Sequence, residues 1–279
     1  LDILKIVHPT IIHPWRDKIA KAGTLKEMKQ LRKDLAEFKV LDPACGSGDF
    51  LYVAFRELKR VEMELLNKIH TEFPKSAGEI GTQSIVSIKQ FHGMDFNPFA
   101  AELSKVTLML AKEIAIKETR DWVDTIQTGI GFQMEETLPL DNMNKNILFA
   151  DALFTEWIDA NVIIGNPPYQ SKNKMQEEYG IEYLNKLWDA FPEVPGRADY
   201  CVYWFYKAHR NLKVGGFAGL VGTNTIRENY SREGSLDYIA DNGGTIFNAI
   251  SSQPWSGDAA VSVSIVNWIK GEYSKPKFL

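Results

Sequence analysis

The sequence has few of the features that indicate secretion, metal binding or a membrane span. Cys45 and Cys201 are the only cysteines among 279 residues. They are too few for a disulfide framework and lack metal-ligand spacing, as do the five histidines. No apolar run is long enough to cross a bilayer, and the first residues do not resemble a signal peptide. We therefore expect a cytoplasmic protein with no metal in this portion.

Excess charge and internal repetition are also absent. The 32 basic residues against 36 acidic ones give a net charge of -4. A protein that coats nucleic acid by charge alone would be basic, although this balance still allows a local basic groove. No repeat or low-complexity tract is visible. With 44% hydrophobic residues, the chain has the composition of one large globular domain or two small ones.

Alternating helical and strand-like patterns predict an α/β fold. We expect strands at residues 38–41, 88–93, 146–149, 162–164, 217–221, 245–249 and 259–269. We expect helices at 16–38, 49–69, 99–117, 200–212 and 228–241, a short helix near 180–190 within the irregular segment 171–199, and loops at 71–84, 120–145 and 251–257. Strands separated by helices predict a mainly parallel, doubly wound sheet, and the last two strands can form an antiparallel hairpin at one edge.

A glycine-rich corner, residues 42–48, follows the first expected strand and precedes a long helical pattern. In a parallel sheet, ligands bind beyond the carboxyl ends of the strands. Gly46 and Gly48 allow a tight turn and a close approach of the backbone to a ligand. The next helix directs its free N–H groups to the same place. Asp42 would repel a phosphate, and no lysine follows the glycines, so we expect a ligand that carries a cation.

Two more acids follow expected strand ends. Asp95 has the position at which an acid usually accepts hydrogen bonds from ribose hydroxyls, and Phe96 could lie on a purine. Asp151, after the third strand, could accept from an exocyclic amine. Each of these residues could alone be a local cap or turn residue. Their combination at successive strand ends indicates a ligand that contains a nucleoside.

The fourth expected strand ends in a stiff corner, Asn166-Pro167-Pro168-Tyr169. Each proline fixes its φ angle and lacks a backbone donor. Each also keeps the preceding residue out of helical geometry. The corner therefore presents an amide, two free carbonyl groups and an aromatic ring. This set suits a planar group that carries an NH2.

These motifs resemble those of a known family. Residues 41–51 resemble the S-adenosylmethionine motif of amino-directed DNA methyltransferases, and residues 166–169 resemble their catalytic motif. The order of the motifs resembles the γ arrangement of adenine-N6 enzymes. The fuller pattern is similar to the methyltransferase part of type IIG and IIL restriction-modification polypeptides; it comprises residues 40–51, the run to Leu103-Ser104, and residues 138–140 and 254–261. The resemblance covers about residues 35–270.

The resemblance implies a class I Rossmann-like fold that binds S-adenosylmethionine, with a helical lead over residues 1–38 and a catalytic domain over 39–279. It implies that target recognition and cleavage belong to further domains or subunits, and that double-stranded DNA is the partner. The implied cofactor-binding residues are Asp42, Pro43, Ala44, Cys45, Gly46, Gly48, Asp95, Phe96, Asp151 and Ala152. The implied catalytic residues are Asn166, Pro167, Pro168 and Tyr169.

The implied chemistry is methylation of an adenine that has been flipped out of the duplex. The Asn166 side-chain carbonyl and the Pro167 backbone carbonyl would accept both N–H bonds of the target amine, while Tyr169 stacks on the base. Trp255 would cover the other side of the ring or pack as a core residue of the closing hairpin. Lys172 would touch a DNA phosphate or lie in a solvated loop.

Other residues have simpler interpretations. Cys45 is expected to be a small residue beside the cofactor, because cytosine-C5 methylation needs a Pro-Cys in the catalytic corner. An aromatic cluster at helical spacing is expected to pack in the core; it comprises Tyr200, Tyr203, Trp204 and Tyr206. Asp199 and Tyr200 could in addition touch the cofactor or the target base.

Several alternatives remain open. The γ enzymes carry a further cofactor element near the N-terminus, often Tyr-Thr-Pro, and residues 1–34 show no clear copy. Protein-glutamine and RNA-guanine methyltransferases also use Asn-Pro-Pro-Tyr, and cytosine-N4 enzymes more often use Ser-Pro-Pro-Tyr or Ser-Pro-Pro-Trp. A non-catalytic cofactor-binding module of a defence complex is a further alternative. The prediction is site-specific DNA adenine-N6 methylation in a restriction-modification or phage-defence system.

Overall fold

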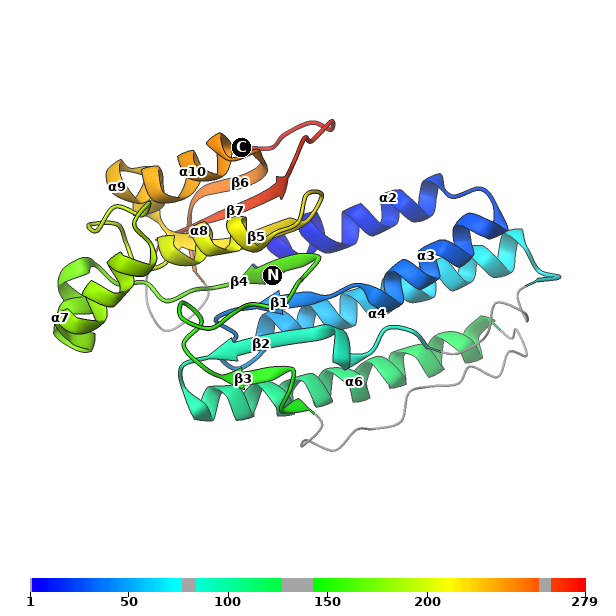
Figure 1. Ribbon diagram of the computed structural model, residues 1–279. Coiled ribbons are helices and arrows are strands. Elements are labelled where there is room, and N and C mark those ends of the chain that lie inside the picture. Colours follow the sequence, from blue (N-terminus) through cyan, green and yellow to red (C-terminus); the bar gives the residue numbers. More distant parts are fainter. Residues whose placement is uncertain (1, 77–83, 127–142, 256–261) are drawn as a thin grey trace.

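The computed structural model describes residues 2–76, 84–126, 143–255 and 262–279. Within them one sheet has the strand order β3-β2-β1-β4-β5-β7-β6 (Figure 1). The strands are β1 (Val40–Asp42), β2 (Phe91–Asp95), β3 (Ile147–Phe149), β4 (Val162–Gly165), β5 (Phe217–Thr223), β6 (Gly244–Pro254) and β7 (Ser262–Lys270). The strands β1 to β5 pair in parallel, and β7 is antiparallel to both β5 and β6. The predicted parallel sheet with an antiparallel C-terminal hairpin is confirmed.

Helices cover both faces of this sheet. They are α1 (Leu4–Val7), α2 (His13–Lys21), α3 (Leu25–Glu37), α4 (Asp49–Glu72), α6 (Pro98–Ile126), α7 (Lys172–Ala190), α8 (Val202–Asn211), α9 (Asn229–Arg232) and α10 (Tyr238–Asp241). Short 3-10 or π segments occupy His8–Ile12, Ile88–Gln90, Asn224–Arg227 and Glu233–Asp237. Among the described residues, no helix is both long enough and apolar enough to cross a membrane.

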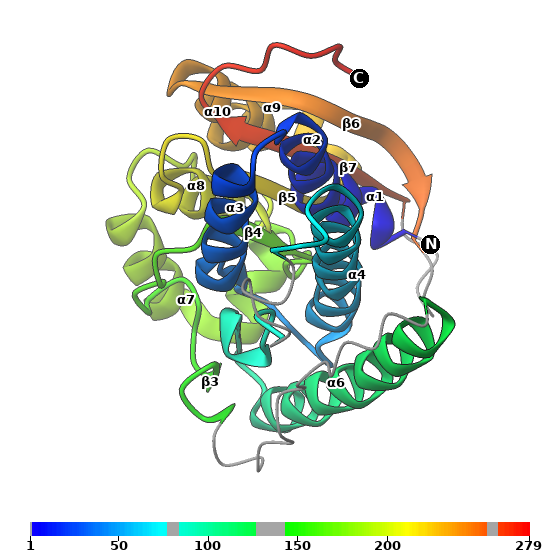
Figure 2. The ribbon, with the colours of Figure 1, turned by 90° about the vertical axis from the view of Figure 1, so that its right-hand side faces the viewer.

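The strand side chains divide the interior into two layers, because successive residues of a strand point to opposite faces. Val40, Val162 and Ile164 pack with the helices from α1 to α6. Leu41 and Ile163 pack with α7, α8 and α10. Figure 2 shows α4 and α6 on one side of the sheet and α7 and α8 on the other.

The N-terminal helices belong to the same core as the sheet. A Cβ built on Gly219 of β5 would lie 2.3 Å from Asn267 Oδ1 and 2.7 Å from Ile6 Cγ2. The Asn267 amide donates to the carbonyl oxygen of Lys5 at 3.0 Å. Residues of the helical lead therefore pack directly on the centre of β5, and the glycine permits this close approach.

Two predicted elements are wrong because capping residues interrupt them. The helix expected over 16–38 is two helices: α2 ends at Lys21 and α3 begins at Leu25. Thr24 and Glu27 form a capping box that starts the second helix. Residues 88–90 form a 3-10 turn instead of strand, and β2 begins only at Phe91.

Further differences concern the lengths of elements. The segment 171–199, predicted to be mostly irregular, contains the 19-residue helix α7, whose Gly180 is non-helical (φ 79°, ψ 167°). Helix α6 extends to Ile126, into the predicted loop 120–145. Strand β6 continues to Pro254, into the predicted loop 251–257. The helix predicted over 228–241 is a series of short helical segments. Residues 77–83 and 127–142, which belong to predicted loops, and residues 256–261 lie outside the described residues.

The packing at Gly219 gives a stability prediction. Gly219→Ala is expected to lower the free energy of unfolding by about 1–3 kcal/mol, because its new methyl group overpacks a buried contact. Gly23→Ala is the matched control, since nothing lies within 4 Å of its Cβ position. Denaturant unfolding of both variants is the measurement. Equal stability of the two variants would show that the N-terminal helices do not pack tightly on β5.

Candidate active site at the carboxyl ends of the strands

A cavity of about 500 Å³ lies beyond the carboxyl ends of the parallel strands. This volume suits a small-molecule cofactor. Its walls come from the ends of four strands, from α7 and from the start of α8. The lining residues are Pro43, Ala44, Gly46, Asp95, Phe96, Asn97, Asp151, Ala152, Asn166, Pro168, Tyr179, Tyr183, Tyr200 and Trp204. In Figure 1, β2 and β4 point toward the side of the molecule where α7 lies.

The glycine-rich loop after β1 is fixed by contacts with α6. Gly46 and Gly48 have positive φ angles of 52° and 88°. The Ser104 hydroxyl donates to the Gly46 carbonyl oxygen at 2.8 Å. A Cβ on Gly48 would lie 3.0 Å from Ser104 Cα, so the glycine allows the loop to lie against the helix. The loop therefore has one defined conformation at the N-terminus of α4.

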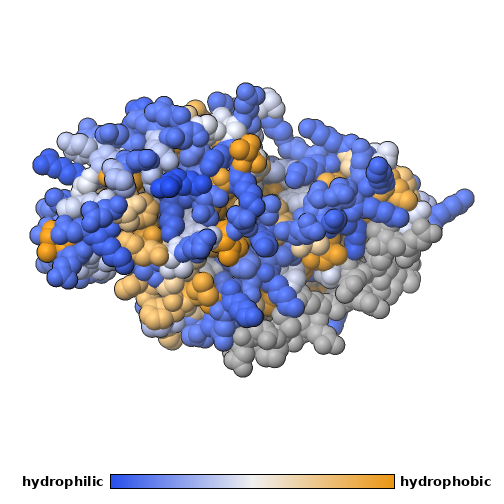
Figure 3. Space-filling view, viewed as in Figure 1, coloured by the Kyte–Doolittle hydropathy of each residue, from blue (hydrophilic) through white to orange (hydrophobic). Residues whose placement is uncertain are grey.

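Asp95 connects the end of β2 to this loop. Its Oδ2 accepts from the backbone N–H of Gly46 at 2.9 Å, and its Oδ1 accepts from that of Asn97 at 2.8 Å. Carboxylate oxygens have further lone pairs, so Asp95 can still accept from a ligand hydroxyl. The neighbouring Phe96 is 65% exposed. Figure 3 shows hydrophobic side chains gathered at the lower left, over the start of α6 and the ends of β2 and β3.

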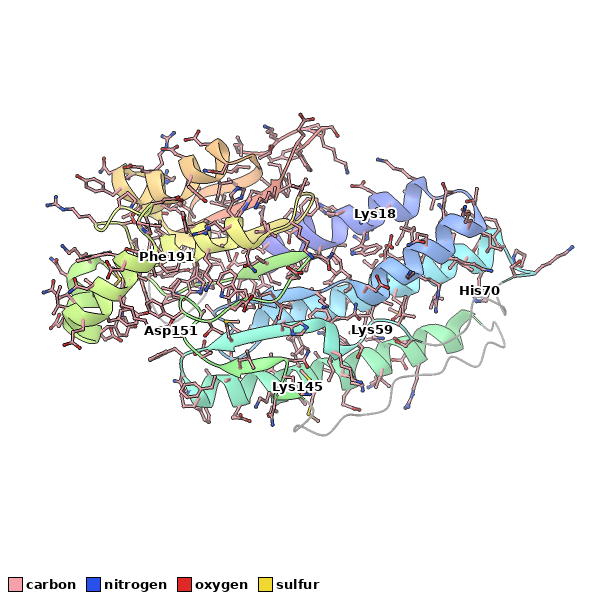
Figure 4. The ribbon with its side chains drawn as sticks, in the orientation of Figure 1. Lys18, Lys59, His70, Lys145, Asp151 and Phe191 are labelled. Carbon is pink, nitrogen blue, oxygen red and sulfur yellow. The ribbon has the colours of Figure 1, made fainter. Side chains whose placement is uncertain are left out.

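Asp151 occupies the corresponding place after β3 and lies on the side of the molecule that carries α7 (Figure 4). Its Oδ1 accepts from the Leu153 N–H at 2.9 Å, and its Oδ2 accepts from the Tyr183 hydroxyl at 3.0 Å. The ammonium of Lys207 donates to the carbonyl oxygens of Ala152, Leu153 and Thr155 at 2.7–3.0 Å. Burial lowers the pKa of Lys207 to about 8. This half-buried lysine fixes the turn that presents Asp151.

Helix α8 contributes both core packing and cavity wall. Tyr203 and Tyr206 are buried among the core residues, as expected. Tyr200 and Trp204 are also buried, but each has a surface that faces the cavity. The Trp204 indole N–H donates to the Pro43 carbonyl oxygen at 3.0 Å. The aromatic cluster therefore supports the glycine-rich loop in addition to filling the core.

The Asn-Pro-Pro-Tyr corner brings Asn166 and Pro168 to the cavity wall. The Tyr169 hydroxyl donates to Asn166 Oδ1. The Tyr169 ring packs against the core that contains α1 to α4 and α6, and Tyr169 is not one of the residues that line the cavity. Burial raises the pKa of the Tyr169 hydroxyl above its ordinary value, so it is a neutral donor.

Asp42 lies beneath the cavity instead of in its wall. The residue is fully buried, and its Oδ1 accepts from the Ala44 N–H at 3.0 Å. Its Oδ2 has no hydrogen-bond partner among the described residues. Burial raises the pKa of Asp42 to about 8, and the nearby Asp95 and Asp49 add to this effect. Below that pH the carboxyl is mostly protonated, so it carries less charge than the sequence suggests.

Cys45 is buried in the same loop. Burial raises the pKa of its thiol, and Asp42 raises it further. Thiolate reactivity is therefore suppressed, which agrees with its interpretation as a small structural residue.

Two predicted substrate-binding residues lie away from the cavity. The Trp255 ring stacks on Phe50 with centroids 6.5 Å apart and an interplanar angle of 8°. Lys172 is the first residue of α7, and its ammonium lies 5.1 Å from the centroid of the Trp188 ring near the end of the same helix. Both side chains are paired with an aromatic ring of the same chain.

Besides Trp204, which was expected only to pack in the core, three lining residues were missed in the sequence. Asn97 caps α6, since its Oδ1 accepts from the Phe99 N–H at 2.9 Å, and its place before Pro98 is a recognisable capping signal. Tyr179 and Tyr183 lie on α7 on either side of Gly180, whose non-helical φ and ψ interrupt the helix. Their segment was interpreted as irregular, and no regular helical spacing in the sequence marks the two tyrosines as neighbours.

The lining has a clear chemical preference. It contains the carboxylates of Asp95 and Asp151, and no lysine or arginine among the described residues. Such a wall suits hydroxyls, amines and cations and disfavours phosphates. Among the described residues, no group of three or more His, Cys, Asp or Glu could hold a metal ion.

The buried Asp42 gives a prediction about pH. Its pKa rises from 3.8 to about 8 on folding, so the native state holds an extra proton between these values. The contribution of Asp42 to the free energy of unfolding should therefore be highest below pH ~4 and fall toward pH ~8, by up to about 1.4 kcal/mol per pH unit. Asp42→Asn should remove this decrease in the free energy of unfolding. Asp159→Asn, which replaces an exposed acid, should keep the decrease. Urea denaturation from pH 5 to 8 is the measurement, and parallel curves for the two variants would contradict it.

Comparisons with known proteins show the family of this chain. A family model described as the DNA-methyltransferase domain of MmeI matches residues 18–279. DNA methyltransferase A of Bacillus subtilis (strain 168) is 24% identical over 97% of this chain and 30% of that protein. The adenine-specific methyltransferase PglX of Streptomyces coelicolor is 24% identical over 71% of this chain and 17% of that protein.

Solved structures share the fold. The type IIL restriction-modification enzyme MmeI in complex with DNA gives a TM-score of 0.77 at 23% identity, over 99% of this chain and 37% of that one. The type ISP enzyme LlaGI gives a TM-score of 0.54 at 14% identity, over 99% of this chain and 23% of that one. The chain thus spans 17% to 37% of the length of these four relatives. S-adenosylmethionine is the cofactor of this class of methyltransferase, and the cavity lining fits it. Because the family model covers nearly the whole chain, the protein belongs to the family of MmeI DNA-methyltransferase domains.

Proposed function

We propose that this chain methylates the N6 amine of adenine in double-stranded DNA, after the base has been flipped out of the duplex. The main observation in support is that Asn166 lines the same cavity as Asp95 and Asp151. An amide acceptor beside a nucleoside-sized cavity is what methylation of a planar amine requires. A relative named as adenine-specific and a fold match to a DNA-bound enzyme support the choice of substrate.

The cofactor would lie across the strand ends. We assign the ribose hydroxyls to Asp95 and the exocyclic amine of the cofactor's adenine to Asp151. The exposed ring of Phe96 would cover the purine. Asp42, beneath the loop, would attract the cationic ligand electrostatically. A cation above Asp42 would lower the pKa of its carboxyl and favour the ionised form. The bound cofactor supplies an electrophilic methyl group on a sulfonium.

The catalytic corner would activate the target amine by accepting its N–H bonds. The lone pair of an adenine amine is delocalised into the ring, which makes it a poor nucleophile. If Asn166 Oδ1 and the Pro167 carbonyl oxygen each accept a hydrogen bond from one N–H group of the amine, they would favour a pyramidal nitrogen. A nitrogen–methyl bond would form as the sulfonium–methyl bond breaks, which leaves S-adenosylhomocysteine, and the methylated nitrogen would release one proton to solvent. Positioning and electrostatic complementarity would supply most of the rate.

Tyr169 would have to move in this scheme, because its ring packs against the core outside the cavity lining. Its hydroxyl donates to Asn166 Oδ1, which has a second lone pair for the target amine. Movement of the ring toward the base would break this hydrogen bond, and the ring could then stack on the base. Stacking of this kind contributes roughly 1–3 kcal/mol per base and would offset part of the cost of flipping.

The proposal predicts the effect of Asn166→Ala. Loss of one acceptor for the reacting amine should lower methyl transfer by about 10²–10³-fold while cofactor binding stays nearly unchanged. Asn173→Ala is the matched control, because Asn173 is an exposed amide on α7. The assay measures labelled methyl transfer to DNA, RNA and protein pools, with nucleoside analysis of the product. Label in protein or RNA alone would refute the proposal, and N4-methylcytosine would correct the base.

The ribose assignment gives a separate prediction. Asp95→Ala should weaken binding of S-adenosylhomocysteine by about 1–3 kcal/mol, the range for hydrogen bonds to a charged group. Asp159→Ala, which removes an exposed acid paired with Lys213, should leave binding unchanged. Titration calorimetry is the measurement, and unfolding curves would confirm that both variants fold. Equal affinities in the two variants would place the ribose elsewhere.

A further inference from the structure

Two tyrosine hydroxyls lie behind Asp151 in a hydrogen-bonded chain. The Tyr183 hydroxyl is 3.0 Å from Asp151 Oδ2 and 2.6 Å from the Tyr200 hydroxyl. All three residues line the cavity. The two tyrosines come from different elements, since Tyr183 lies on α7 and Tyr200 precedes α8.

Counting protons fixes the direction of this chain. A tyrosine has one O–H, and a carboxylate can only accept. Tyr183 therefore gives its proton to Asp151, and the bond between the two hydroxyls must use the proton of Tyr200. Burial raises the pKa of both hydroxyls above their ordinary value, so both keep their protons.

At this end of the cavity, the side chains of Asp151, Tyr183 and Tyr200 can accept hydrogen bonds but have no spare donor among them. Asp151 Oδ1 already receives the Leu153 N–H, and Oδ2 receives the Tyr183 hydroxyl. The remaining lone pairs suit an NH2 group. A carbonyl oxygen at the same place would need a donor, and each hydroxyl could donate only by breaking its present bond.

We infer that Tyr183, supported by Tyr200, is a positioning residue that makes the cavity selective for a 6-aminopurine nucleoside over a 6-oxopurine one. This inference rests on the proposed function, in which Asp151 receives the cofactor's adenine. Tyr183 acts through Asp151: its hydroxyl holds Oδ2 in the orientation that the purine amine requires.

The shape of α7 explains how Tyr183 reaches this position. Gly180 breaks the helix with a φ of 79°, between Tyr179 and Tyr183. Both rings then face the cavity with centroids 5.1 Å apart. The Tyr183 ring also packs edge-on against Phe154 at 5.5 Å. Ring packing thus holds the side chain in place without its hydroxyl.

This packing makes Tyr183→Phe a clean test, because only the hydroxyl is lost. Tyr179→Phe is the matched control, since the Tyr179 hydroxyl interacts with Glu178 and Gln170 instead of bonding to Asp151. The probes are S-adenosylhomocysteine and S-inosylhomocysteine, its 6-oxo analogue. Titration calorimetry gives the ratio of their dissociation constants for each protein.

The wild-type protein should prefer the adenosyl probe by at least about a hundredfold, because a site built around a hydrogen bond rejects the analogue that lacks it. Tyr183→Phe should reduce this preference by about tenfold or more, mainly through weaker binding of the adenosyl probe. Tyr179→Phe should leave the ratio within about twofold of wild type.

The possible failures are distinguishable. If Tyr183→Phe weakens the binding of both probes equally, the ratio of their dissociation constants stays the same. The Tyr183 hydroxyl then has only a structural role, and the inference is overturned while the cofactor assignment stands. If the wild-type protein binds both probes equally well, or neither, then the placement of the purine at Asp151 is wrong and the inference fails with it.

Discussion

The site depends on carbonyl oxygens of the strand-end loops that receive hydrogen bonds from buried and half-buried donors on the helices. Ser104 on α6 donates to Gly46, while Trp204 and Lys207 on α8 donate to Pro43 and to three carbonyls after β3. An unsatisfied buried carbonyl costs free energy, so these donors select one conformation for each loop. The cavity is thereby shaped before any ligand arrives, and binding need not supply the cost of ordering it.

Strand order brings the two halves of the site together. Because β1 pairs with β4, the loop that starts at Asp42 lies beside the corner that starts at Gly165. A Cβ on Gly165 would lie 2.5 Å from Asp42 Oδ1, so the glycine lets the catalytic corner lie against the cofactor loop. The buried carboxyl between them is held mostly protonated by its surroundings. A cation above the loop would favour its ionised form, which couples ligand charge to a group shared by both loops.

The sequence predicts those parts of the site that are local in the chain. The glycine-rich loop, the acids after β2 and β3, and the Asn-Pro-Pro-Tyr corner each occupy a few consecutive residues beside a recognisable strand. The capping box of Thr24 and Glu27 was equally local and could have divided the first helix. Helix α7 was harder to predict, because its buried residues Met175, Leu184 and Leu187 are separated by the break at Gly180 and surrounded by polar side chains. The stacking of Trp255 on Phe50 depends on tertiary contacts alone.

Tertiary contacts also connect the Asp151 end of the cavity to the Asn-Pro-Pro-Tyr corner. The Tyr200 N–H donates to the Gln170 carbonyl oxygen at 2.9 Å, directly after Tyr169, and α7 begins at Lys172. A force that moves Tyr200 or Tyr183 therefore acts on the backbone next to Tyr169. If the cofactor's adenine binds at Asp151, it stabilises these two tyrosines in their present positions and thus limits the motion of the corner.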